Sequence, residues 1–191
     1  MSGWWAASYI VLWALVIMLC AVVVALARQI GTLHLRLGPT GALEIDEEGP
    51  PLGEAPAPIE AVALDETPVT IGGPAEPQLL LFVSPGCRVC REVLPGTSAV
   101  AAAHDLRPVI VAGEHYGAPD EIDPTGSGAT VVASAEVMSS YNIPGTPYAV
   151  VIDRGGIVRA KGTVNNLEQL EGLAETARRR ETGRLDPHHA R

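Results

Sequence analysis

The stretch LLLFVSPGCRVCREVLPG, residues 79–96, decides the fold, because an unbroken apolar run meets two cysteines two residues apart. The apolar run predicts a short buried strand over residues 78–84. The Pro85-Gly86 pair then breaks the strand, and a helical pattern begins. Cys87 and Cys90 are therefore expected at the start of a helix, directly after a strand.

Three uses of this cysteine pair compete: a redox couple, half of a metal site, or two inert thiols. Structural zinc takes four ligands, but the chain has no second C-x-x-C, and only chance would bring His104 and His115 to the pair. At a helix start, unpaired N–H groups and the helix dipole favour an anion, and the neighbouring Arg88 adds positive charge. The pKa of the Cys87 thiol is therefore expected below the free value of about 8.5.

A thiolate at an exposed helix start, with a second thiol one turn further on, is what thiol–disulfide exchange requires. One sulfur attacks a client and the other resolves the mixed disulfide. We therefore predict a redox pair in which Cys87 is the nucleophile, Cys90 is the resolving thiol and Arg88 tunes the thiolate. This chemistry needs no metal and no organic cofactor.

The folded part alternates strands and helices, which indicates an α/β domain. Two short apolar stretches within residues 61–73 predict a hairpin before it. The further predicted elements are strands at 107–112, 129–133, 148–153 and 157–161 and helices at 87–104, 135–141 and 166–179.

The N-terminal segment predicts a transmembrane anchor over residues 4–27, which contain no charged residue before Arg28. A membrane-spanning helix needs about 20 apolar residues. A cleaved signal peptide competes, because "ALA" at residues 25–27 resembles a cleavage site. Signal sequences, however, have apolar regions of about 7–15 residues after a basic segment, which is missing here. Cys20 lies inside the span and is expected to act as a small apolar residue.

The basic residues nearest the span, Arg28 and Arg36, follow it, and none precedes it. By the positive-inside rule alone, the domain would lie in the cytoplasm, yet long domains can translocate regardless of charge. Topology signals therefore leave the sidedness open.

Residues 28–58 are expected to be a juxtamembrane segment and linker. Leucines alternate with polar residues over residues 33–37, which argues against a regular helix there, and Gly38-Pro39 stops any helix before it. Residues 44–58 are rich in Pro, Gly and Glu, as in a semi-extended linker. The domain is expected over residues 59–179, followed by a disordered tail at 180–191.

The charge balance excludes one broad class of function. The chain has 191 residues, enough for one domain with appendages, and 22 acidic against 13 basic residues give a net charge of −9. A general nucleic-acid-binding protein would carry a basic patch and a high isoelectric point, so no nucleic-acid partner is expected.

The layout resembles the thioredoxin family: a strand, a C-x-x-C at a helix start, then a late X-Pro before a hairpin and a last helix. Pro95 lies five residues after the second cysteine, where that family has a helix proline. Thr146-Pro147, in IPGTPYAVVID, matches the cis-proline that faces the disulfide. The resemblance implies a central mixed sheet flanked by helices. It also implies that Thr146 and Pro147 form the substrate-facing surface, where the Thr146 backbone pairs with an extended client segment.

Two longer stretches are similar to the MauD family, the membrane-anchored thioredoxin-like accessory proteins of methylamine utilisation. They are ALARQIGTLHLRLGPTGAL (25–43) and PYAVVIDRGGIVRAKGTVNNLEQLEGL (147–173). The resemblance implies a single-pass protein of the inner membrane with its redox domain in the periplasm. It further implies a cysteine-containing client, the small subunit of methylamine dehydrogenase, and a membrane or periplasmic redox partner.

The sequence departs from these families in three places. Arg88 and Val89 stand between the cysteines, where the family commonly has a proline. Residues 113–128 are short and rich in Gly and Pro where a full helix is usual, and Leu81 takes the place of thioredoxin's buried acid. Two other functions remain as alternatives: an anchored thiol reductase for cytochrome c maturation, and a copper chaperone. No Met or His near the motif offers the latter an obvious third ligand.

Overall fold

The chain forms two units, Met1–Gly38 and Pro39–Arg191, in a computed structural model that describes residues 3–37, 48–113 and 128–183. The first unit contains one helix, α1 (Gly3–Leu37). The helix continues without interruption through residues 33–37, so the expectation of an irregular segment there is wrong. Adding residues to an existing helix is favourable, and leucine is a good helix former, so the helix continues until the Gly38-Pro39 pair.

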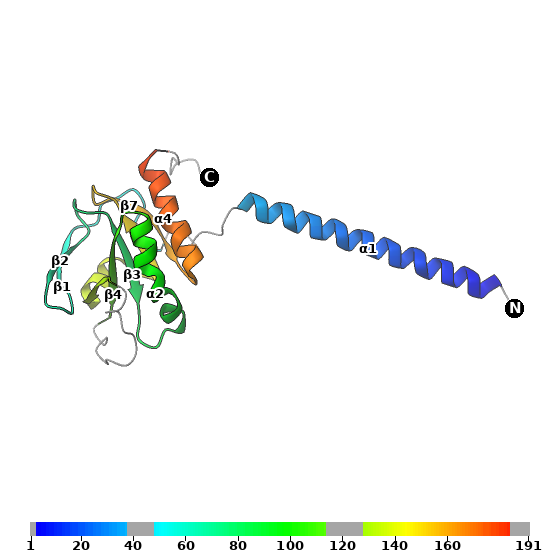
Figure 1. The fold of residues 1–191 in the computed structure, drawn as a ribbon, viewed down its shortest axis with the longest axis horizontal. Helices are drawn as coiled ribbons and strands as arrows, with labels where there is room; N and C mark the ends of the chain where they lie inside the picture. The colour runs from blue at the N-terminus through cyan, green and yellow to red at the C-terminus, as the bar shows by residue number, and fades with distance from the viewer. Residues whose placement is uncertain (1–2, 38–47, 114–127, 184–191) are drawn as a thin grey trace. The chain divides into compact units, whose positions relative to one another are not determined.

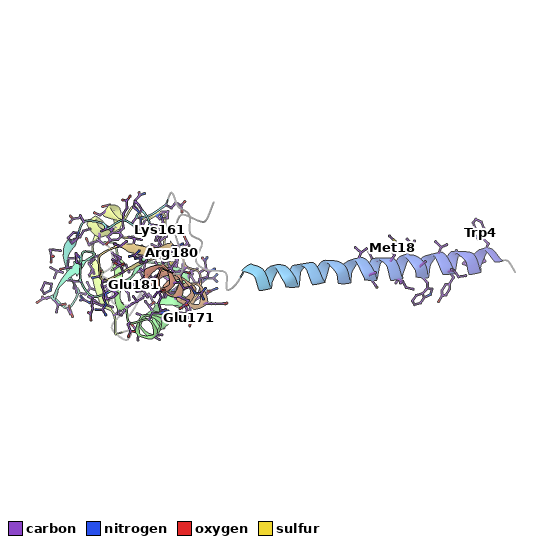
Figure 2. All side chains as sticks on the ribbon, turned by 90° about the horizontal axis from the view of Figure 1, so that it is seen from above. Trp4, Met18, Lys161, Glu171, Arg180 and Glu181 are labelled. Atoms are coloured by element: carbon purple, nitrogen blue, oxygen red, sulfur yellow. A yellow bond between two sulfur atoms is a disulfide. The ribbon has the colours of Figure 1, made fainter. Side chains whose placement is uncertain are left out.

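The part of α1 at Gly3–Val23 is long and apolar enough to cross a membrane, with a mean hydropathy of 2.5. None of this span is buried in the protein, whereas an apolar helix of a soluble protein would be packed into a core. Figure 2 shows side chains along this helix, among them Trp4 and Met18. A membrane anchor and a signal sequence both meet this description.

The domain is built on a mixed sheet with strand order β5-β4-β3-β6-β7. The central strand β3 (Gln78–Val83) runs parallel to β4 (Arg107–Ala112), which runs parallel to β5 (Thr130–Ala133). On its other side β3 pairs antiparallel with β6 (Tyr148–Ile152), which pairs antiparallel with β7 (Val158–Thr163). Every residue of β3 is buried, as expected for a strand covered on both faces.

Helices and a hairpin cover the two faces of this sheet. Figure 1 shows α2 (Arg88–Ala103) and α4 (Leu167–Glu181) side by side on one face. The core of the opposite face includes residues of α3 (Ala135–Ser140) and of the hairpin β1 (Ile59–Val62) and β2 (Pro68–Ile71). The predicted hairpin and the predicted mixed sheet flanked by helices are confirmed. The element bounds differ from the predicted ones by a few residues, as is usual at fraying ends.

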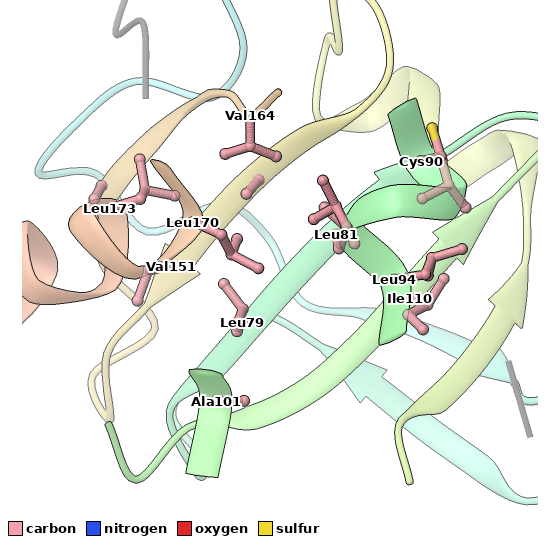
Figure 3. Close-up of a cluster of buried hydrophobic side chains, with 14 of the residues drawn as sticks. Leu79, Leu81, Cys90, Leu94, Ala101, Ile110, Val151, Val164, Leu170 and Leu173 are labelled. Atoms are coloured by element: carbon pink, nitrogen blue, oxygen red, sulfur yellow. The ribbon is translucent and has the colours of Figure 1, made fainter. Parts of the chain in front are cut away.

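Alternating side chains of β3 build the two cores, because successive residues of a strand face opposite sides of the sheet. Leu79 and Leu81 pack toward α2 and α4, and Leu80 and Phe82 pack toward the other face. Figure 3 shows the first of these clusters, in which the labelled Cys90 lies with apolar residues of the sheet and α2. The second cysteine of the motif is thus part of the hydrophobic core.

The residues from Glu48 onward contact the domain instead of forming the extended linker expected there. The Glu48 carbonyl accepts hydrogen bonds from Tyr148 Oη at 3.1 Å and from Lys161 Nζ at 2.7 Å. The Gly53 N–H donates to the Val158 carbonyl at 2.9 Å. A composition rich in Pro and Gly disfavours helices and strands, but it leaves backbone carbonyls available for tertiary contacts. The predicted tail starts too early at residue 180, because the last helix continues to Glu181 and Arg180 donates a hydrogen bond to the Arg159 carbonyl at 2.9 Å. The expected linker residues at 38–47 and the tail residues at 184–191 lie outside the described residues.

Tyr141 lies in the second core with its ring 5.5 Å from that of Phe82, and its hydroxyl has no partner among the described residues. Burial raises the pKa of Tyr141 to about 12, against about 10 in an unfolded chain. The folded protein therefore keeps this proton where the unfolded chain loses it. The free energy of unfolding is therefore unaffected by this group below about pH 10 and falls as the pH rises to about 12, by at most about 2.7 kcal/mol.

We expect Tyr141→Phe to weaken the loss of stability between about pH 10 and pH 12. At pH 7 the substitution should be neutral or slightly stabilising, because it removes a buried hydroxyl that has no hydrogen bond. Tyr148→Phe is the matched control, and it should cost about 1 kcal/mol at pH 7 because it loses the bond to Glu48. Urea unfolding across the pH range measures both, and an unchanged pH dependence in Tyr141→Phe would show that another group causes the loss.

Candidate active site

Cys87 caps the N-terminus of α2, at the place where the sequence predicts it. Strand β3 ends at Val83, and Gly86 adopts a φ of 74°, which a residue with a side chain rarely tolerates. The Cys87 Sγ then accepts a hydrogen bond from the Cys90 N–H at 3.1 Å. The sulfur therefore lies among the free N–H groups of the first turn, where negative charge is stabilised.

The two cysteines form a disulfide but have unequal environments. Their Cα atoms are 5.3 Å apart. Cys87 is partly exposed, whereas Cys90 has an exposed fraction of 0% and lies in the apolar core. An attacking thiolate can reach Cys87 only, which supports the predicted division into nucleophile and resolving thiol.

The Thr146–Pro147 peptide bond is cis, and it faces the disulfide as the resemblance implies. The Cys87 Sγ lies 3.9 Å from the Thr146 carbonyl oxygen. Pro147 is buried, and its carbonyl accepts a hydrogen bond from the Val164 N–H at 3.2 Å. The structure therefore brings the Thr146–Pro147 bond next to Cys87, although Thr146 follows Cys87 by 59 positions in the sequence.

Ser84 is a site residue that sequence reasoning missed. Its Oγ lies 2.6 Å from Thr146 Oγ1, a hydroxyl pair that ties the end of β3 to the loop before Pro147. The partners are 62 positions apart, so no local pattern signals the contact. The pair thus connects Ser84 to the residue whose carbonyl oxygen lies 3.9 Å from the Cys87 Sγ.

Leu81 lies in the same core cluster as Cys90, and every member of that cluster is apolar. Leucine at this position places an apolar side chain in the core that contains the second cysteine.

Arg88 lies exposed in the first turn of α2, which contains no acidic residue. We expect Arg88→Glu to raise the pKa of the reduced Cys87 thiol and to move its pH–alkylation curve upward by about half a pH unit. Exposed charges contribute less than about 1 kcal/mol because solvent screens them, and one pH unit corresponds to about 1.4 kcal/mol. Quenched alkylation with mass spectrometry measures the curve. An unchanged curve would remove Arg88 from its tuning role.

No group of three or more metal-binding side chains occurs among the residues that the structure describes. His104 ends α2 as its C-cap, at the opposite end of the helix from Cys87. His115 and most of the segment 113–128 lie outside the described residues.

The chain is similar to several curated proteins over most of its length. It is 35% identical over 182 residues to the methylamine utilization protein MauD of Methylobacillus flagellatus, covering 93% of this chain and 88% of that protein. It is 36% identical over 187 residues to MauD of Paracoccus denitrificans, covering 93% and 91% of the two chains. No family model matches the chain.

Solved structures show the same fold at lower identity. The thioredoxin domain of a thiol–disulfide oxidoreductase from Bacteroides vulgatus has a TM-score of 0.53 at 20% identity, covering 66% of this chain and 97% of that one. A thio-disulfide isomerase from Thermus thermophilus has a TM-score of 0.51 at 23% identity, covering 66% and 96%. The predicted thioredoxin fold is confirmed.

Proposed function

The chain belongs to the MauD family of methylamine utilisation proteins, and from this premise we propose that it delivers a disulfide to a client of that system. Its domain is a thioredoxin-like thiol–disulfide oxidoreductase. The observation that carries the proposal is the Cys87–Cys90 disulfide at the start of α2, facing the cis Thr146–Pro147 bond.

In the proposed reaction, a client thiolate attacks Cys87 Sγ and breaks the Cys87–Cys90 bond. The client and Cys87 then share a mixed disulfide, and the Cys90 sulfur leaves as a thiolate and takes up a proton. A second client thiolate attacks the client sulfur and releases Cys87. The client loses two electrons and two protons, and the domain gains them. A membrane or periplasmic redox partner then reoxidises the Cys87–Cys90 pair.

We infer that the client is the small subunit of methylamine dehydrogenase, in which the domain would help disulfides to form. The support is the membership of the MauD family together with the accessible sulfur of Cys87. The Thr146 backbone would pair with an extended segment of this client, beside the position at which the Cys87 sulfur reacts.

Because the chain belongs to the MauD family, we propose that it is a single-pass protein of the inner membrane with its redox domain in the periplasm. Helix α1 supports the anchor by its length and hydropathy. Disulfides form and persist in the periplasm and are rare in the cytosol, so an enzyme that introduces them has to act on that side. This placement overrides the weak signal of two arginines after the span.

The direct experiment incubates the oxidised full-length protein, in detergent, with the reduced small subunit. Alkylation and mass spectrometry should show client disulfides forming at the rate at which Cys87 and Cys90 become reduced, and Cys87→Ser should stop the reaction. Faster reduction of a disulfide in apocytochrome c by the reduced protein would favour the cytochrome c maturation alternative. Tight Cu(I) binding without any exchange would favour a copper chaperone.

A further inference from the structure

Two exposed arginines, Arg88 and Arg91, lie on α2 beside the reactive sulfur. Within the described part of the chain, neither guanidinium makes an ion pair or a hydrogen bond. The arginines of α4 differ, because Arg178 and Arg179 both bind the Glu175 carboxylate. Arg88 and Arg91 therefore form an unpaired positive site next to the cysteine pair, in a chain whose net charge is −9.

Both arginines lie within about one helical turn of Cys87. Arg88 follows Cys87 directly, and the Arg91 N–H donates to the Cys87 carbonyl at 3.4 Å, one turn along the helix. Positions three apart lie on the same face of a helix. A single basic turn of α2 therefore flanks the reactive sulfur.

The other described segments around the sulfur are uncharged. Residues 84–86, residues 142–147 and residues 164–166 contain no charged side chain. The nearest acidic residue on α2 is Glu92, which is exposed and makes no ion pair with Arg88. Among the described residues around the sulfur, positive charge therefore comes from the two arginines.

We propose that Arg88 and Arg91 recognise carboxylate side chains next to the client's reactive cysteine. This inference rests on the proposed function and adds a charge preference to it. A client in extended conformation advances about 3.3 Å per residue. Acidic residues within two or three positions of its cysteine therefore come within reach of the guanidinium groups. Arginine binds carboxylates through a planar fork of donors, and a cationic rim also attracts an acidic segment during encounter.

The test uses the oxidised full-length protein in detergent and three synthetic dithiol peptides that differ only beside their cysteines, with Glu, Gln or Lys. Flanking charge also alters the reactivity of the peptide thiols, so each rate is divided by that peptide's rate with an uncharged small disulfide. At low salt the Glu peptide should be oxidised about five times faster than the Gln peptide, and the Lys peptide should be slower. The differences should shrink at 0.5 M salt, because salt screens exposed charges.

The double substitution Arg88→Gln with Arg91→Gln should bring the Glu-to-Gln rate ratio close to one. Any general change in Cys87 reactivity affects all three peptides and cancels in this ratio. Arg154→Gln is the matched control, because Arg154 is exposed and lies in the β6–β7 turn, at the opposite end of the sheet from Ser84. That variant should keep the ratio of the unaltered protein.

Three results would overturn the inference. Equal normalised rates for all three peptides would disprove charge recognition and leave the proposed exchange activity standing. An unchanged ratio in the double variant would assign the selectivity to other residues. If no peptide is oxidised at all, the proposed function fails, and this inference falls with it.

Discussion

Cys90→Ser should accumulate mixed disulfides between the protein and its clients, and Cys87→Ser should accumulate none. Cys87 is partly exposed, and its sulfur accepts a hydrogen bond from the backbone N–H of Cys90 in the first turn of α2. The Cys90 side chain is fully buried. In Cys90→Ser the Cys87 thiolate can attack a disulfide of an oxidised client, which releases one client thiolate, and without the Cys90 thiol the resulting mixed disulfide is not resolved from within the domain. Either substitution should remove measurable turnover. Non-reducing gels and mass spectrometry of trapped species provide the measurement.

Alkylation of the reduced protein gives an independent check on the same assignment. Cys87 should be modified first at mildly acidic pH, because a thiolate at a helix N-terminus is stabilised and accessible. If Cys90 reacts first, or if both thiols titrate near the free value of about 8.5, the nucleophile has been assigned wrongly. Equal reactivity of the two thiols, with no mixed disulfide trapped in Cys90→Ser, would favour a metal-binding role for the cysteine pair.

Deleting residues 1–28 should move the protein from the membrane fraction to the soluble fraction with its exchange activity retained. The intact protein should remain with membranes through a carbonate or high-salt wash, because the apolar span Gly3–Val23 is not buried in the protein and about 20 such residues suffice to cross a bilayer. The domain has its own sheet and two hydrophobic cores, so it should fold without the helix. Fractionation followed by an exchange assay measures both properties.

The N-terminal sequence of the recovered protein shows whether α1 is a membrane anchor or a cleaved signal sequence. An intact N-terminus in the membrane fraction supports an anchor, whereas a mature N-terminus near residue 28 in the soluble fraction identifies a cleaved signal sequence. Intact protein in the soluble fraction would contradict both.

Residues 79–96 predicted the strand, the turn and the position of Cys87 at a helix start, and the structure places all three there. Such features depend on neighbouring residues, since strand and helix periodicity and the break at Pro85-Gly86 are local properties. The apolar N-terminal helix was predictable for the same reason. The alternation of leucines with polar residues over residues 33–37 led to a wrong prediction of irregular structure. It is too short to outweigh the favourable continuation of an existing helix.

The sequence by itself therefore determined the redox motif, the order of strands and helices, and a helix able to span a membrane. Only the tertiary structure decided what surrounds the motif. It joined Ser84 to Thr146 across 62 positions and Lys161 to the Glu48 carbonyl across 113 positions, and it selected the cis form of the Thr146–Pro147 bond. It also buried Cys90 while leaving Arg88 and Arg91 exposed and unpaired within the described residues. Contacts between distant residues depend on how the whole chain packs, and local periodicity carries no information about that packing.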